Sequence, residues 1–268
     1  MNSVRIAHIS DIHYNPGDFS QISTMLREKG LDVEEHLERC LKSLSGKHPD
    51  ILLVTGDLTH EGDAGAYRYL KEQFDSLLPG VPVLCTMGNH DIRSAFREGF
   101  LEESVSGENA GAPYQTVLSV KGFRFISLDS AYERGLEGFL SDDSLDYLED
   151  QLLRTPARGA FLLVHHPVMA AAGPMSLMMT ERLSRLLGSG KITGIFTGHV
   201  HGSYTASVCG VPQFTADSLK TGCDLLNGAL AYNDRAGYEF VSFERKGDWL
   251  AERFLVRPRT DVFFTKPF

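Results

Sequence analysis

The sequence has few cysteines, no excess of positive charge and no long apolar run. Its four cysteines, Cys40, Cys85, Cys209 and Cys223, show no C-x-x-C spacing, which argues against a zinc–thiolate site and against a disulfide framework. No stretch approaches the roughly 20 apolar residues that span a membrane. Residues 1–5 lead directly into a predicted strand, without the apolar core of a signal peptide. We therefore expect a reducing, cytoplasmic setting and no membrane partner.

The balance of charge is acidic, with a formal net charge of −9 over 268 residues. This argues against a nucleic-acid partner, because a surface that follows a phosphate backbone is basic. Hydrophobic residues make up 42% and charged residues 23% of the chain, as in ordinary globular proteins. An acidic protein can still bind an anionic substrate if metal ions supply the positive charge.

Short apolar runs alternate with amphipathic stretches over most of the chain. This pattern predicts strands at 4–10, 51–54, 81–86, 114–120, 123–128, 161–164 and 192–196, and helices at 31–44, 63–78, 92–101, 142–153 and 177–187. Residues 203–256 are predicted to form only strands and turns. We expect one domain over residues 1–268, an α/β fold built as a four-layer α/β/β/α sandwich of two mixed β-sheets flanked by helices. Residues 203–256 would complete the second sheet.

Polar clusters follow five of the predicted strands. They are Asp11 with His13, Asp57, Asn89 with His90 and Asp91, His165 with His166, and His199 with His201. The carboxyl ends of parallel strands meet at one edge of a sheet, where α/β proteins bind their ligands. Side chains two residues apart in an extended segment point the same way, which pairs Asp11 with His13 and His199 with His201.

The clusters offer imidazole, carboxylate and amide oxygen but no thiolate, a set that favours Zn, Mn, Fe or Co. There are more ligands than one tetrahedral ion needs. Two ions roughly 3.5–4 Å apart with a bridging carboxylate would fit. The candidate ligands are Asp11, His13, Asp57, Asn89, His165, His199 and His201. Two carboxylates cancel only half the charge of two divalent ions, so such a site would attract a phosphodiester and form hydroxide at neutral pH.

In their order, the motifs Asp-x-His, Gly-Asp, Gly-Asn-His-Asp, His-His-Pro and Gly-His-x-His resemble those of the calcineurin-like metallophosphoesterases, over roughly residues 4–202. Segments 9–13, 56–59, 128–130, 138–140 and 165–167 are similar to the branch of class III cyclic-nucleotide phosphodiesterases and glycerophosphodiesterases. The sequence departs from that branch at Val168, where many members carry a second proline. It also departs in the alanine- and methionine-rich stretch 170–179.

The resemblance implies a role for each motif residue. One ion would be held by Asp11, His13, Asp57 and His201, and the second by Asp57, Asn89, His165 and His199, with Asp57 bridging. His90 would stabilise charge on the phosphate or protonate the leaving oxygen, and Asp91 would orient His90. Asn89 and His90 would also contact the substrate.

Several residues near these motifs have two interpretations. His166 is either a substrate contact or a packed neighbour, and His60 either supports the site or has no part in it. Asp129 is either a sixth polar cluster or a turn residue. Met169, Met175, Met178 and Met179 are predicted to form an adaptable apolar wall.

These patterns together predict a dinuclear-metal phosphoesterase. The reaction would be in-line attack of a metal-bridging hydroxide on a small soluble phosphodiester, and the resemblance to the branch implies a cyclic nucleotide or a glycerophosphodiester as the substrate. The alternatives are a phosphomonoesterase or broad-specificity phosphohydrolase and, more remotely, a non-catalytic scaffold with the same fold. A nuclease is disfavoured because no basic stripe with interleaved aromatic residues is present. Sheet edges in the last third of the chain could support a homodimer.

Overall fold

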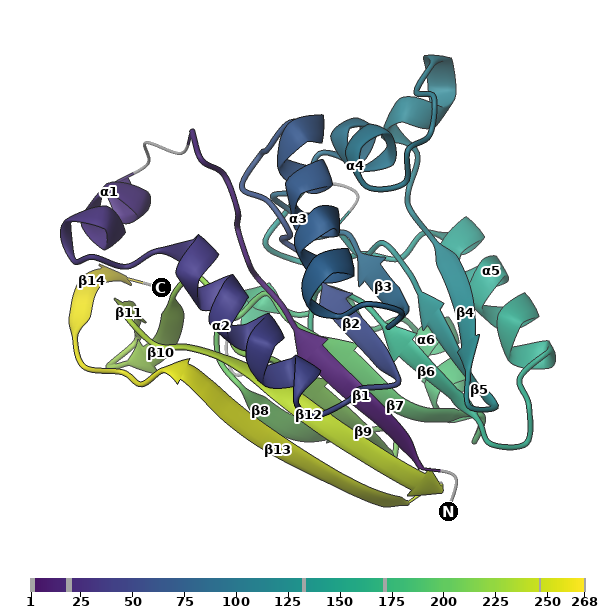
Figure 1. Cartoon of the computed structure of the whole chain (residues 1–268). Coiled ribbons are helices and arrows are strands. Elements are labelled where there is room, and N and C mark those ends of the chain that lie inside the picture. The colour runs from purple at the N-terminus through teal and green to yellow at the C-terminus, as the bar shows by residue number, and fades with distance from the viewer. Residues whose placement is uncertain (1–2, 18–20, 132–133, 171–172, 246, 268) are drawn as a thin grey trace.

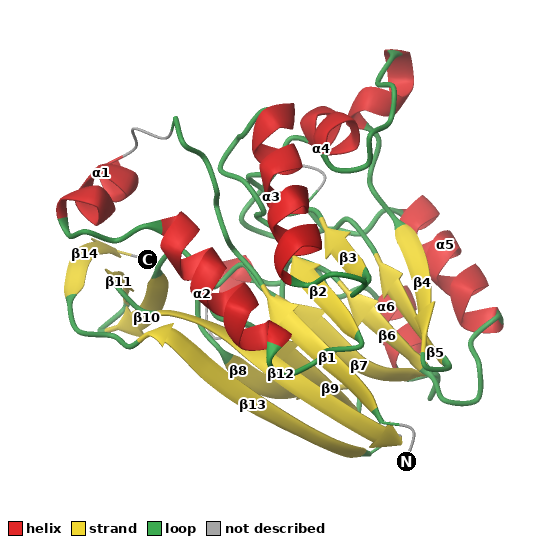
Figure 2. Ribbon diagram, in the orientation of Figure 1, coloured by secondary structure: helices red, strands yellow, loops and turns green. Residues whose placement is uncertain are grey.

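The computed structural model describes residues 3–17, 21–131, 134–170, 173–245 and 247–267. Helices lie on the outside and two large sheets lie between them, as Figure 2 shows. Within the described residues, no helix is both long enough and apolar enough to cross a membrane. Residues 171–172 of the alanine- and methionine-rich stretch lie outside the described residues.

The first sheet has five strands in the order β13-β12-β1-β2-β3. Their bounds are β1 (Val4–Ile9), β2 (Ile51–Thr55), β3 (Val83–Thr86), β12 (Ala236–Arg245) and β13 (Asp248–Arg257). β1, β2 and β3 are parallel, while β12 pairs antiparallel with β1 in a register that sets Val4 opposite Phe243. The sheet is therefore mixed, with its parallel half formed by the first strands of the chain.

The second sheet has six strands in the order β4-β5-β6-β7-β9-β8. Their bounds are β4 (Thr116–Val120), β5 (Phe123–Ser127), β6 (Ala160–Leu163), β7 (Ile192–Thr197), β8 (Tyr204–Val208) and β9 (Val211–Thr215). The four central strands are parallel, and β4 and β8 pair antiparallel at the two edges. The strands predicted at 114–120 and 123–128 form β4 and β5, which pair as an antiparallel hairpin.

The two large sheets pack face to face over a core rich in phenylalanine. Ile6, Ile51 and Leu53 of the first sheet share this core with aromatic rings of the second. The rings belong to Phe123, Phe125, Phe161, Phe196 and Phe214. β2, β6 and β7 are buried along their whole length, because each is covered by the opposite sheet on one face and by helices on the other.

Helices cover the outer face of each large sheet (Figure 1). Over the first sheet these are α2 (Val33–Ser45), α3 (Ala64–Leu77) and α4 (Arg93–Gly99), and over the second α5 (Asp142–Leu153) and α6 (Glu181–Leu187). The predicted four-layer sandwich is confirmed.

A polar side chain that caps the first turn determines where a helix begins. The helix expected from residue 177 begins only at Glu181, because the Thr180 side chain accepts a hydrogen bond from the backbone N–H of Leu183.

Three features differ from the expectation. β12 and β13 extend the first sheet, so only β8 and β9 of residues 203–256 lie in the second. A separate three-stranded sheet forms from β10 (Gly222–Leu226), β11 (Ala229–Asn233) and β14 (Val262–Pro267). Helix α1 (Gln21–Glu28) lies near this small sheet (Figure 1), and short 3-10 turns occur at Gly107–Gly111 and Gly173–Met175.

Candidate metal centre

The loops that follow parallel strands of both large sheets meet at one place. Asp11 and His13 follow β1, Asp57 follows β2 and Asn89 follows β3, all in the first sheet. The loops after β6 and β7 of the second sheet supply the other three predicted ligands, His165, His199 and His201. The structure thus brings together all seven side chains, although they lie up to 190 residues apart in the sequence.

One group of ligand atoms lies around His13. Its Nε2 is 3.0 Å from Nε2 of His201 and 3.4 Å from Oδ2 of Asp57. Oδ1 of Asp11 is 3.4 Å from Nε2 of His201 and has no hydrogen-bond partner, although it is buried. A buried carboxylate oxygen without a partner is costly. A cation placed among these atoms would satisfy it.

A second group surrounds His165. Its Nε2 lies 3.2 Å from Oδ1 of Asn89, 3.1 Å from Nδ1 of His199 and 3.5 Å from Oδ2 of Asp57. The same Asp57 oxygen therefore lies between both groups. Burial alone would raise the pKa of Asp57, but the nearby charges of His165 and His13 lower this pKa well below its ordinary value. An ionised carboxylate in this position suits a bridge between two cations.

Hydrogen bonds to carbonyl oxygens orient three of the four candidate histidine ligands. Nδ1 of His165 lies 2.7 Å from the oxygen of Thr55, Nε2 of His199 3.0 Å from that of Leu136, and Nδ1 of His201 2.9 Å from that of Thr221. A carbonyl only accepts, so each of these nitrogens donates. In the neutral imidazole, the form that binds a metal ion, the opposite nitrogens carry lone pairs directed into the two groups. Such a donor set fits divalent metal ions.

One hydrogen bond joins the two sheets at this site: the backbone N–H of His199 donates to Oδ2 of Asp11 at 2.9 Å. Within the first sheet, the N–H of His13 donates to the backbone oxygen of Asp57 at 2.8 Å. Glycine allows the close approach. A Cβ on Gly88 would collide with Asp57, and one on Gly198 would collide with Ser10. Steric exclusion of a Cβ therefore explains why glycine stands in the Gly-Asn and Gly-His motifs.

The backbone itself is unusual at these positions. Five of the candidate ligands have φ in the left-handed region, between 48° and 72°. They are Asp11, His13, Asp57, His199 and His201. Residues other than glycine seldom adopt this conformation, and they tend to do so at functional sites.

His90 lies beside the two groups rather than within them. Its N–H donates to Oδ1 of Asp57 at 2.9 Å, and its ring is 5.1 Å from the ring of His13. The ring also stacks on that of His60, with centroids 4.4 Å apart. His60 in turn places Nδ1 3.3 Å from Nδ1 of His13. Burial lowers the pKa of His90.

Asp91 makes contacts other than the predicted one with His90. Its buried carboxylate accepts hydrogen bonds from the backbone N–H groups of Leu58, Thr59 and Gly88 and from the hydroxyl of Tyr67. Burial and the nearby Asp57 raise its pKa to about 6. The prediction that Asp91 orients His90 is therefore corrected: the four donors take up its oxygens, and the carboxylate joins the loops that carry Asp57 and Asn89.

Two residues with open interpretations have structural partners. His166 is fully buried, with Nδ1 3.1 Å from the Ser130 hydroxyl and Nε2 3.3 Å from the oxygen of Gly135. It is a packed neighbour, and its predicted role as a substrate contact is corrected. Asp129 forms two hydrogen bonds of 2.7 Å with Arg93. It is therefore a buried ion-pair partner and not a further ligand.

The turn after β9 supports the site and was not predicted from the sequence. Ser218 donates to the oxygen of Asp11 at 2.8 Å, and Thr221 supplies the carbonyl that orients His201. A cavity of about 300 Å³ lies over the ligand groups. Its walls include Lys220 of this turn and the apolar side chains of Leu136, Met175, Leu230 and Tyr232. The signal that could have found the turn is Asp217-Ser218, a polar pair that follows the strand-like segment 211–215 as the other clusters follow their strands.

Known proteins resemble this chain in sequence. Residues 4–203 match the family model described as calcineurin-like phosphoesterase. The cAMP/cGMP dual specificity phosphodiesterase of Mycobacterium tuberculosis is 31% identical over 241 residues, which cover 87% of this chain and 72% of that protein. A protein of Arcobacter nitrofigilis named "Probable glycerophosphodiester phosphodiesterase GpdQ" is 30% identical over 192 residues, 66% of this chain and 69% of that protein.

The fold has solved counterparts as well. A crystal structure of a dimetal phosphatase from Danio rerio superimposes with a TM-score of 0.59, covering 92% of this chain and 98% of that one. The two sequences are 16% identical, so this likeness concerns the arrangement of the elements.

Proposed function

The chain belongs to the calcineurin-like phosphoesterase family of metal-dependent phosphoesterases, and from this premise we propose that it hydrolyses a small phosphodiester. A cyclic nucleotide or a glycerophosphodiester is the proposed substrate class, because relatives named for each share about 30% of their residues with this chain. The observation that carries the proposal is the convergence of lone pairs from both sheets around Oδ2 of Asp57.

We propose two metal ions. The first would be held by Asp11, His13, Asp57 and His201, and the second by Asp57, Asn89, His165 and His199. Support comes from the orphaned oxygen of Asp11 and from the position of Asp57 between the groups. When bound, the ions would lower the pKa of the attacking water and neutralise the phosphoryl oxygens. Fe, Mn, Zn and Co all suit these ligands.

His90 is proposed to act on the substrate itself. Its partly exposed ring lines the cavity over the ligand groups, and its backbone is fixed by the hydrogen bond to Asp57. From there the imidazole can donate a hydrogen bond to a phosphoryl oxygen or a proton to the departing alkoxide. The apolar wall formed by Leu136, Met175, Leu230 and Tyr232 would exclude water from the leaving group.

A substrate panel tests the reaction class. With added Mn²⁺ we expect faster turnover of bis(p-nitrophenyl) phosphate than of p-nitrophenyl phosphate, together with hydrolysis of cyclic AMP or glycerophosphocholine. A reversed preference would make the protein a phosphomonoesterase. Absence of turnover with Mn²⁺, Zn²⁺, Fe²⁺ and Co²⁺ alike would favour the non-catalytic scaffold.

Two variants test the site. His90→Ala should lower kcat by about 10²–10⁴-fold, the usual contribution of a general acid, and Asn89→Ala should weaken metal binding as well. His48→Asn, at an exposed position on the surface, is the control. Unchanged diesterase activity in both site variants, with circular dichroism spectra like the wild type, would remove the proposed site.

The setting and assembly also remain proposals. We propose the cytoplasm, supported by cysteines that form no disulfide within the described part of the chain. A homodimer stays a prediction, for which the open edges of β13 and β14 offer surfaces.

A further inference from the structure

A second cavity lies beside the candidate metal centre, on the loop after β5. It measures about 500 Å³ and is formed by one stretch of this loop together with a methionine from the segment between β6 and α6. We name it the lateral groove, and its lining residues are Gly135, Leu136, Glu137, Gly138, Phe139 and Met178. Leu136 also lines the cavity over the ligand groups. Both cavities therefore adjoin the same leucine side chain.

Hydrogen bonds fix the loop of the lateral groove to the metal centre. The carbonyl oxygen of Leu136 accepts from Nε2 of His199 at 3.0 Å. Two residues earlier, Nε of Arg134 donates to the carbonyl oxygen of Asn89 at 3.2 Å. The groove is thus held in place relative to two candidate ligands, and a substrate bound at the metal centre can place a side group in it.

The wall formed by Met178 is joined to the same loop. The N–H of Met178 donates to the oxygen of Gly138 at 2.8 Å, and the N–H of Gly138 donates to the oxygen of Ser176 at 3.0 Å. A Cβ on Gly138 would collide with the ring of His166, so the loop lies directly against that residue. Because backbone hydrogen bonds join its two walls, the groove is preformed.

The lateral groove exposes apolar side chains to solvent. Leu136 is 63%, Phe139 39% and Met178 45% exposed. Exposed apolar side chains that stand singly are ordinary, but several that line one recess indicate a site for an apolar ligand. Among the described residues that line the groove, Glu137 alone is charged, and its negative charge disfavours an anionic group there.

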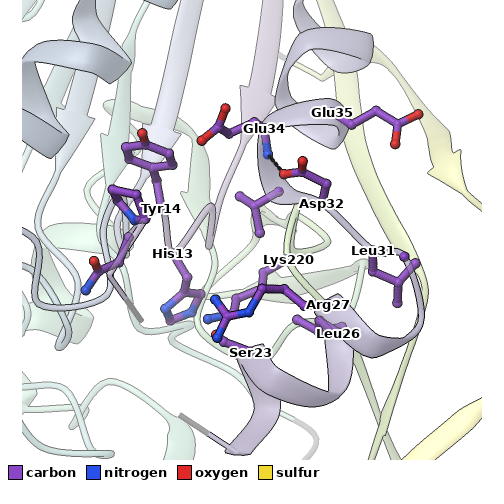
Figure 3. A pocket seen from close by; sticks show the side chains of 14 residues that line it. His13, Tyr14, Ser23, Leu26, Arg27, Leu31, Asp32, Glu34, Glu35 and Lys220 are labelled. Carbon is purple, nitrogen blue, oxygen red and sulfur yellow. Dashed lines mark hydrogen bonds between the residues drawn. The ribbon is translucent and has the colours of Figure 1, made fainter. Parts of the chain in front are cut away.

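A third cavity also borders the metal centre, through His13, but its chemistry differs. It measures about 520 Å³ and lies between α1, the start of α2 and the loop after β1. Side chains of both charges line it, as Figure 3 shows for Arg27, Lys220, Glu34 and Glu35. An apolar chain placed there would remove water from these groups at a cost in free energy. The lateral groove is therefore the better site for an apolar group.

We propose that the lateral groove binds an aliphatic chain carried by the substrate. This inference rests on the proposed diesterase function and narrows its substrate class to phosphodiesters with an alkyl or acyl group outside the scissile bond, such as an acylated glycerophosphodiester. In the reaction, water adds to phosphorus, one alkoxide leaves with a proton, and the chain is bound without being altered. Burial of its methylene groups against Leu136, Phe139 and Met178 supplies the affinity.

Phosphinates isolate the contribution of the chain, because they carry the single negative charge of a diester but no ester bond. We expect hexyl(methyl)phosphinate to bind the Mn²⁺-loaded protein at least about tenfold more tightly than ethyl(methyl)phosphinate, since the groove removes part of the four additional methylene groups from water. An ether chain of similar length, 2-(2-methoxyethoxy)ethyl, should lose most of this gain. Calorimetric titration measures all three affinities.

Variants assign the preference to the groove. Phe139→Ser and Met178→Ser should each reduce the ratio of hexyl to ethyl affinity by about threefold or more, whereas Phe139→Leu should keep most of it. Leu250→Ser and Leu255→Ser are matched controls, because both leucines are exposed on β13, at the edge of the first sheet. The controls should keep the wild-type ratio, and circular dichroism should show the same fold in all five variants.

Turnover separates this proposal from the diesterase function. 1-Hexanoylglycerophosphocholine should have a kcat/KM at least about tenfold higher than that of glycerophosphocholine, chiefly through KM, and Phe139→Ser should reduce this ratio. A hexyl preference in binding that depends on Phe139 and Met178, in a protein without diesterase turnover, would sustain the groove and refute the proposed reaction.

Three results would overturn the groove while leaving the diesterase function in place. The first is diester turnover with equal binding of the hexyl and ethyl phosphinates, or with a hexyl preference that survives both serine variants. The second is tighter binding of a 6-aminohexyl phosphinate than of the hexyl compound, which would assign the groove to a cation. The third is binding to phosphatidylcholine vesicles that Phe139→Ser abolishes, without a hexyl preference, which would make the groove a membrane contact.

Discussion

The ring of His60 connects two histidines of the site, since it contacts Nδ1 of His13 and stacks on His90. The other three histidine ligands are oriented by backbone carbonyls, which no substitution of a side chain can remove directly. His13 instead depends on a side chain. The orientation of this one candidate ligand is therefore open to mutation.

His60→Ala should weaken the binding of Mn²⁺ by about 10–100-fold, the usual cost of losing a group that orients a metal ligand. Calorimetric titration of metal-free protein with Mn²⁺ measures this, and His60→Gln should restore part of the affinity by again offering a polar partner. His48→Asn serves as the control. Wild-type affinity in His60→Ala would show that His13 is held without it.

Among single residues, the motif residues could be predicted from the sequence, but the hydrogen bonds that hold them in place could not. Asp11, His13 and Asp57 stand directly after predicted strands, so their convergence follows from strand direction. The partners of Asp91 depend on how the loops after β2 and β3 pass each other. Lys220 has no distinctive neighbours in the sequence, and its position follows from the path of a turn anchored to another loop.

Among the elements, helix α4 approaches the start of α3 so closely that a side chain is excluded. A Cβ on Gly99 would collide with the backbone oxygen of Ala64. Gly46, at the end of α2, has φ −66° and a nearest neighbouring atom 3.6 Å from an added Cβ. The two glycines differ in the room available for a Cβ and not in their helical backbone conformation.

Gly99→Ala should therefore destabilise the protein by about 1–3 kcal/mol, as overpacking does, despite the better helix propensity of alanine. Gly46→Ala should change the free energy of unfolding by less than about 1 kcal/mol. Urea denaturation of both variants measures the difference. Equal stability would mean that α4 can shift at no cost.

Asp234 fixes the connection from β13 to β14. It accepts from the N–H of Thr260 at 2.7 Å and of Asp261 at 3.0 Å, and from the Thr260 hydroxyl. Burial alone would raise its pKa, but these hydrogen bonds and Arg257 lower it from 3.8 to about 2. Because the folded state prefers the ionised form, the resulting stability is present above about pH 4 and is lost as the pH falls through 2.

Asp234→Asn should accordingly cost roughly 1–2 kcal/mol at pH 7, and this cost should shrink toward pH 2. Denaturant unfolding at a series of pH values measures it. Asp75→Asn, at an exposed position of α3, is the control. A cost that does not change with pH would show that the carboxylate acts through its shape and not its charge.

The elements that could be predicted are those with a local pattern. Amphipathic helices such as α2 and α5, and buried strands such as β2 and β6, show their periodicity within a dozen residues. The sheet to which a strand belongs has no such signal. β12 pairs with β1 more than 200 residues away, and β14 pairs with β11 across about 30 residues, so the small sheet could not be foreseen.

Over the whole molecule, the candidate metal centre joins the two large sheets. Asp11, His13, Asp57 and Asn89 come from one sheet, and the three remaining histidines come from the other. Ions bound there would add to the contacts that the phenylalanine core and the hydrogen bond from His199 to Asp11 make between the sheets. Because they would bind the folded state alone, they should stabilise the entire fold.

Excess Mn²⁺ should raise Tm by on the order of 5–10 °C over protein in chelator, since ligand at 100 times Kd adds about 2.7 kcal/mol. Differential scanning calorimetry measures this. Asp57→Asn should lose most of the rise, because the variant lacks the oxygen shared by both groups. Equal Tm with Mn²⁺ and with chelator would argue against a metal centre that joins the sheets.

The left-handed φ angles of five candidate ligands carry a wider consequence. Such torsions cost a non-glycine residue about 1–2 kcal/mol each, so the backbone of the native state is strained at these positions. Glycine at position 13 would relieve part of that strain, but it would also remove an imidazole ligand. At these five positions the geometry that places a ligand therefore opposes the stability of the fold.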